Sequence, residues 1–81
     1  MKAKEMFELL GWYLDIETNE EQIVYSKNKF DKELFGFIGA KTITFDTEME
    51  SVYLDGVEDI SMLLLQAINQ QCKELGWLED K

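Results

Sequence analysis

The chain contains no histidine, no proline and no arginine, and Cys72 is its one cysteine among 81 residues. Histidine is the usual base in nucleophilic catalysis and a common zinc ligand, so its absence argues against both kinds of site. A lone thiol forms no intramolecular disulfide, which favours a reducing compartment. Without arginine, the chain lacks the side chain that best recognises phosphate and guanine.

Positive charge is also scarce. Seventeen Asp and Glu residues against eight lysines give a formal net charge of −9 at pH 7. Such a charge repels nucleic acids and anionic membranes, so we expect direct binding to neither. The longest apolar run, ISMLLLQAI, is too short to span a bilayer, and the first residues lack a signal peptide's apolar segment. The sequence therefore predicts a cytoplasmic protein.

The length and the 46% hydrophobic content fit a single small acidic domain over residues 1–81. Residues 2–10 predict a first helix, because their apolar side chains recur at helical spacing. Ser61 predicts the N-cap of a second helix. The expected apolar faces of the two helices are Ala3, Met6, Phe7 and Leu10, and Leu64, Ile68, Cys72 and Leu75.

The tripeptide Leu-Gly-Trp follows both helical stretches, at 10–12 and at 75–77. A glycine in the left-handed conformation commonly ends a helix, and the next residue then packs back against the last full turn. We therefore interpret the repeat as a helix stop used twice. Trp12 is expected near Phe7, and Trp77 near Cys72.

Between the helices the apolar period changes to two, which is typical of half-buried strands. The predicted strands cover 12–17, 22–27, 41–46 and 51–55. The intervening segment 28–40, with glycines and mixed charges, is expected to be a loop with an aromatic anchor. Short connections then predict an α+β two-layer sandwich of order α-β-β-β-β-α, an antiparallel meander with both helices on one face.

The residues offer little for catalysis. Cys72 lies on the apolar stripe near a helix C-terminus, where the helix dipole disfavours a thiolate. The acids between 46 and 55 are numerous, but their spacing does not fit a calcium-binding helix–loop–helix. We assign no catalytic residue, no metal ligand and no cofactor site. A metal-dependent hydrolase is the remaining enzyme alternative.

The open face of the sheet and the turns at its edge form the first candidate interaction surface. Its acids would attract a basic protein partner, or they would only keep the chain soluble. The expected members are Tyr13, Asp15, Glu17, Asp46, Glu48, Tyr53 and Asp55.

The second candidate surface lies on the C-terminal helix. Helical geometry points Met62 almost opposite to the apolar stripe and places Leu63 on its flank. These two side chains either form the contact of a homodimer or are covered by the first helix.

The opening MKAKEMFELLGW, the central KTITFD and VYLDG, and the ending LLQAINQQCKELGW resemble small uncharacterised proteins of phages and prophages of Gram-positive bacteria. This resemblance implies a non-catalytic accessory protein in the cytoplasm of a bacterial host, binding a host or phage protein. It also adds weight to an alternative function, in which the acids mimic DNA and inhibit a host defence nuclease or a DNA-binding regulator.

Overall fold

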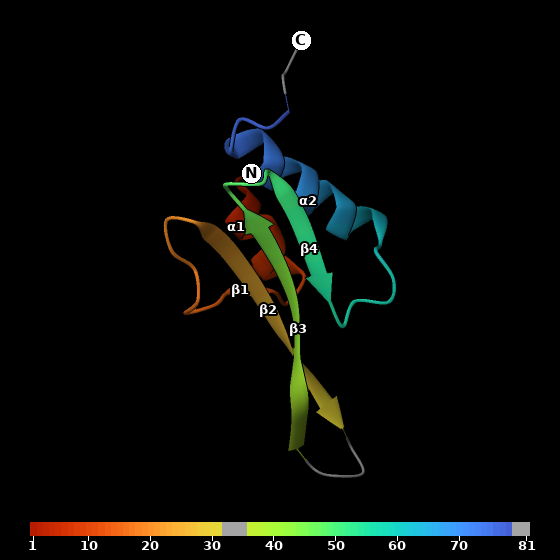
Figure 1. Cartoon of the computed structure of the whole chain (residues 1–81). Coiled ribbons are helices and arrows are strands. Elements are labelled where there is room, and N and C mark those ends of the chain that lie inside the picture. Colours follow the sequence, from red (N-terminus) through yellow and green to blue (C-terminus); the bar gives the residue numbers. More distant parts are fainter. Residues whose placement is uncertain (32–35, 79–81) are drawn as a thin grey trace.

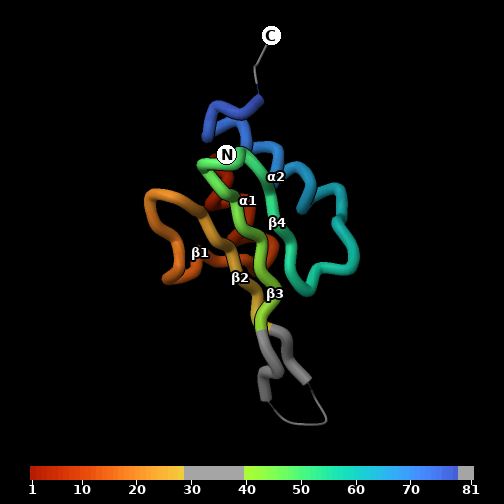
Figure 2. The backbone as a smooth tube through the Cα atoms, in the orientation of Figure 1, coloured from red at the N-terminus to blue at the C-terminus, as the bar shows by residue number. Residues whose placement is uncertain are grey.

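The computed structural model describes residues 1–31 and 36–78, with side chains for residues 1–28 and 40–78. Its elements follow the predicted order, with a helix at each end and an antiparallel meander of strand order β1-β2-β3-β4 between them (Figures 1 and 2). The bounds are α1 Ala3–Leu9, β1 Tyr13–Leu14, β2 Gln22–Asp31, β3 Gly36–Asp46, β4 Ser51–Asp55 and α2 Met62–Glu74.

The core lies between the sheet and the two helices, which cover the same face of the sheet (Figure 1). Phe7 of α1 stacks on Tyr25 of β2 with ring centroids 3.9 Å apart, and Phe45 of β3 packs edge-on against both rings. From α2, Leu64 and Ile68 join this cluster. The predicted two-layer α+β sandwich is therefore confirmed.

Both Leu-Gly-Trp tripeptides end their helices as predicted. Gly11 and Gly76 have φ values of 85° and 79°, in the left-handed region. The Trp12 N–H donates to the Phe7 carbonyl at 2.9 Å, and the Trp77 N–H donates to Cys72 at the same distance. Each glycine N–H makes the second, shorter-range bond that completes a Schellman motif.

The two helices begin differently. Ser61 caps α2 locally, because its hydroxyl accepts the Leu64 N–H at 3.1 Å. Lys2, at the N-cap of α1, makes no such bond. Instead the Ala3 N–H donates to the Glu74 carboxylate of α2 at 2.7 Å. A residue 71 positions away therefore satisfies a donor that the first helix leaves free.

The first strand is shorter than predicted, because the chain turns at Asp15. The Asp15 carboxylate accepts the Glu17 N–H at 3.0 Å, an Asx turn that competes with continued strand pairing. The Thr18 hydroxyl then replaces the backbone partner that a longer β1 would give Val24. It accepts the Val24 N–H and donates to the Val24 carbonyl. The strand predicted over 12–17 was therefore too long, and Ile16, beyond its observed end, is fully exposed.

The predicted loop over 28–40 was also wrong for the residues that the structure describes there. β2 and β3 continue through this segment and pair with each other down to Asp31 and Gly36. A register shift after Lys29 marks a bulge in the ladder. Glycines are unfavourable inside strands but are tolerated at such irregularities, so their presence misled the sequence-based interpretation. The expected aromatic anchor lies outside the described side chains.

Candidate interaction surfaces

The strand register defines which residues share the open face of the sheet. Residues directly opposite each other in an antiparallel ladder point to the same side. Tyr13, Ser26, Thr42 and Asp55 form one row across the four strands. The next row on the same face ends at Tyr53, paired with Thr44. Both tyrosines are well exposed, at 57% and 70%. The predicted sheet face is therefore correct for its two tyrosines, for Asp55 and, at the end of β3, for Asp46, which pairs with Ser51.

Acidic residues from two connections lie together at one end of the sheet. Thr47, in the turn between β3 and β4, donates its hydroxyl to the Glu21 carbonyl at 2.8 Å, and its N–H also donates to Glu21. This bond holds the turn 47–50 against the connection between β1 and β2. We call the acids of these two segments the acidic end: Asp15, Glu17, Glu20, Glu21, Asp46, Glu48 and Glu50.

Within the acidic end, two carboxylates have structural partners. The Asp46 carboxylate accepts the N–H groups of Glu48 and Met49 at 2.9 and 3.0 Å and so shapes the turn. Asp15 shapes the turn after β1 in the same way. Because these bonds stabilise turns, Asp15 and Asp46 have a structural role that does not depend on any binding partner.

The predicted surface residues thus do not lie together. Asp46 is at one end of the β3–β4 ladder and Asp55 is at the other, four residue pairs away, which is about 13 Å along a strand. Asp15 and Glu17 were expected on a strand, but they lie in the connection between β1 and β2, which is part of the acidic end. Glu20, Glu21 and Glu50 were not predicted as members of this surface. The β2–β3 ladder ends at the pair Gln22 and Asp46, and the Thr47–Glu21 bonds extend it, so the two acidic turns meet at this end of the sheet.

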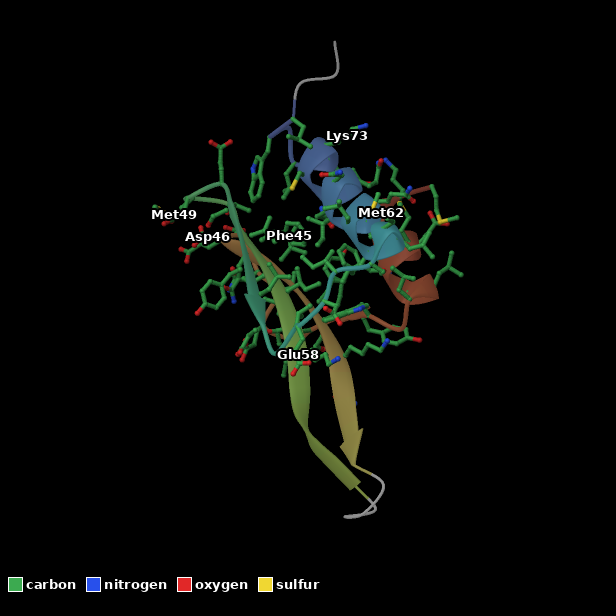
Figure 3. The ribbon with its side chains drawn as sticks, turned by 90° about the vertical axis from the view of Figure 1, so that its right-hand side faces the viewer. Phe45, Asp46, Met49, Glu58, Met62 and Lys73 are labelled. Carbon is green, nitrogen blue, oxygen red and sulfur yellow. The ribbon has the colours of Figure 1, made fainter. Side chains whose placement is uncertain are left out.

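Met62 lies on the opposite side of the molecule from Asp46, and Leu63 follows it on α2 (Figure 3). They remain 68% and 61% exposed, so α1 does not cover them. Leu63 instead forms one wall of an apolar groove between α1 and α2, about 250 Å³ in volume. The groove is lined by Met1, Met6, Leu9, Leu10, Leu63 and Gln66.

Two core groups are held in their neutral forms at physiological pH. Burial raises the pKa of the Cys72 thiol above its usual range, which keeps the sulfur protonated and weakly nucleophilic. Burial, together with the nearby carboxylates of Glu74 and Glu8, raises the pKa of Tyr25 to about 12. The Tyr25 hydroxyl donates to the buried Gln71 side chain at 2.7 Å. Both groups therefore act as packing and hydrogen-bonding residues.

Among the described residues, no three His, Cys, Asp or Glu side chains form a group suited to hold a metal ion. The helices built from those residues include none that is long and apolar enough to cross a bilayer. Comparisons with protein-family models, curated proteins and solved structures found no significant match.

Proposed function

We propose that the chain is a non-catalytic, phage-encoded accessory protein that acts in the bacterial cytoplasm by binding a basic protein partner. The contact surface in this proposal is the open sheet face together with the acidic end. The C-terminal helix α2 is less suited to a basic partner, because it has no charged residue from Met62 to Cys72 and ends with Lys73 beside Glu74.

The observation that carries the proposal is the gathering of two acidic turns by Thr47. Glu20 and Glu48 belong to segments 28 residues apart in the chain, yet both are exposed on the same end of the sheet. A concentration of one sign of charge speeds encounter with a partner of the other sign. The adjacent exposed tyrosines supply the rigid, amphipathic contacts that protein interfaces favour.

The test is retention of partners from host lysate on the immobilised chain, followed by affinity measurement with the identified partner. We expect a basic protein whose binding weakens steeply as salt rises, because the attraction is electrostatic. The double reversal Glu20→Lys/Glu48→Lys should abolish binding. The control Glu58→Lys/Asp59→Lys changes the net charge by the same amount at two exposed sites on the loop before α2 and should retain most of the binding. Equal loss in both variants would contradict a specific acidic surface.

The narrower alternative is a DNA mimic that occupies the DNA-binding groove of a nuclease or regulator. It rests on the same acidic end, with Asp55 as a second charged position along β4. In that version duplex DNA competes with the chain for its partner, and Asp55→Lys weakens binding further. A partner that binds the chain and DNA simultaneously would exclude the mimic while leaving the broader proposal standing.

A further inference from the structure

The outer surface of α2 differs from the rest of the molecule in its charge. Charged residues make up 31% of the chain, yet none occurs in the thirteen residues from Ile60 to Cys72. The exposed side of a surface helix is normally charged or polar. On α2 the exposed side instead presents Met62 and Leu63 beside uncharged Gln66 and Asn69.

Apolar side chains of α1, and of Met1 before it, extend this surface across the groove. Leu9 and Met1 are 74% and 73% exposed on one side, and Leu63 stands on the other. We call these residues, with Met62, the helix patch. It combines projecting side chains with a groove of about 250 Å³ next to them. A surface that carries both a projection and a hollow can fit a rotated copy of itself.

We infer that the helix patch is the interface of a homodimer, in which Met62 and Leu63 of each copy enter the groove of the other. The charge of the chain favours a second copy as the partner at this surface. A basic partner gains nothing from an uncharged surface, whereas two chains of net charge −9 repel each other unless their contact excludes the acids. The helix patch is where two such bodies meet with the least repulsion.

The rim of the groove supports a twofold arrangement. Lys2, Glu5 and Leu9 follow helical spacing of three and four residues, so the two charges lie on the flank of α1 that carries Leu9. Glu5 and Leu9 also line a common hollow. In a twofold contact, Lys2 of one copy faces Glu5 of the other, which gives two equivalent ion pairs at the edge of the apolar contact.

The size of the patch sets the expected affinity. α2 has thirteen residues and is therefore about 20 Å long, and two packed helices are roughly 20 Å wide. A contact of these dimensions falls near the small end of specific interfaces, well under about 800 Å² per copy. The dimer should accordingly be weak, with a dissociation constant in the micromolar range. Because the helices cover the other face of the sheet, both acidic ends stay outward in the dimer.

Sedimentation velocity over a concentration series tests the inference. The wild-type mass should rise from monomer toward dimer through the micromolar range, and the dimer should strengthen as salt screens the repulsion between copies. Binding of a basic partner at the acidic end has the opposite salt dependence. Failure of one proposal is therefore distinguishable from failure of the other.

Leu63→Glu places an unpaired charge in the contact and should raise the dissociation constant by at least about tenfold. The matched control is Ile16→Glu, at a fully exposed position in the connection between β1 and β2, with the same change in charge. Lys2→Glu should weaken the dimer, and Lys2→Glu/Glu5→Lys should restore it. Circular dichroism checks that each variant is folded. A wild-type chain that stays monomeric, or a dimer indifferent to Leu63→Glu, would overturn the inference.

Discussion

The two helices end with the same tripeptide but have different surroundings. After α1, Trp12 is buried in the core with 4% of its surface exposed, and a Cβ on Gly11 would lie 3.4 Å from the Lys27 side chain. After α2, Trp77 is half-buried, and a Cβ on Gly76 would have no neighbour within 4 Å. The same local hydrogen bonds therefore operate in a crowded place and in an open one. The comparison teaches that a local motif fixes a conformation, while its contribution to stability depends on what surrounds it.

The largest expected loss of stability comes from substitutions of the two tryptophans, and the loss differs between them. Trp12→Ala should lower the free energy of unfolding by about 3–5 kcal/mol, because it opens a cavity among buried side chains. Trp77→Ala should lower it by about 1–2 kcal/mol, since less apolar surface is lost. Urea unfolding followed by circular dichroism measures both. If Trp12→Ala does not fold, Trp12→Phe should still cost more than Trp77→Phe, and equal costs would contradict the comparison.

The two glycines form the next test. An alanine in the left-handed conformation costs about 1–2 kcal/mol, so Gly11→Ala and Gly76→Ala should both destabilise. The two losses should be similar, because a methyl group at Gly11 would make only an ordinary van der Waals contact with the flexible Lys27 side chain, 3.4 Å away. Thermal unfolding of both variants gives the difference. A clearly larger loss at Gly11 would show that the surroundings of this glycine add to the cost of its backbone conformation.

Tyr25 contacts both helices, because its ring stacks on Phe7 and its hydroxyl bonds to Gln71. Tyr25→Phe leaves a buried amide oxygen without this donor and should cost about 1 kcal/mol at neutral pH. The raised pKa of Tyr25 means that the folded state holds this proton more tightly than the unfolded state. Its stabilisation is therefore complete below pH 10 and is lost as pH rises from 10 to about 12. Stability measured across this range should fall less steeply in Tyr25→Phe than in wild type.

The smallest expected losses of stability concern the residues that cap the N-terminus of each helix. Ser61→Ala removes a local cap and should cost about 1 kcal/mol. Glu74→Ala removes the carboxylate that accepts the Ala3 N–H and should cost about 0.5–1 kcal/mol, since Glu74 is exposed. The control Glu58→Ala changes charge equally on the loop before α2 and should be nearly neutral. Replacing Lys2 with serine in the Glu74→Ala background should recover part of the loss by giving α1 its own cap.

Sequence patterns were reliable wherever short-range physics decides the structure. The apolar faces of the helices, the cap at Ser61 and both glycine stops depend on spacings of a few residues, and the structure has them as expected. β4 was predicted with its observed bounds, because alternation and flanking turns define it. The strand over 12–17 failed because the Asx turn at Asp15 and the Thr18 hydroxyl offered the backbone alternative partners.

The candidate surfaces were only partly visible in the sequence. Alternation placed Tyr13, Tyr53 and Asp55 on one face, and helical geometry correctly exposed Met62 and Leu63. The acidic end was not predicted as a unit, although the predicted meander places its two turns at the same end of the sheet; the Thr47 hydrogen bonds that join these turns were not visible in the sequence. The groove beside Leu63 was likewise hidden, since it needs α1 and α2 to pack side by side.

By itself, the sequence determined the elements at both ends of the chain, the alternation of the sheet and the excess of acids, because these follow from local spacing and composition. That Glu74 caps a helix at the other end of the chain came only with the packed structure, and so did the Thr47 bonds that join the two acidic turns. The tertiary structure also decided that one Leu-Gly-Trp lies in the core and the other at its margin. Long-range contacts of this kind depend on how whole layers pack, and no window of neighbouring residues carries that information.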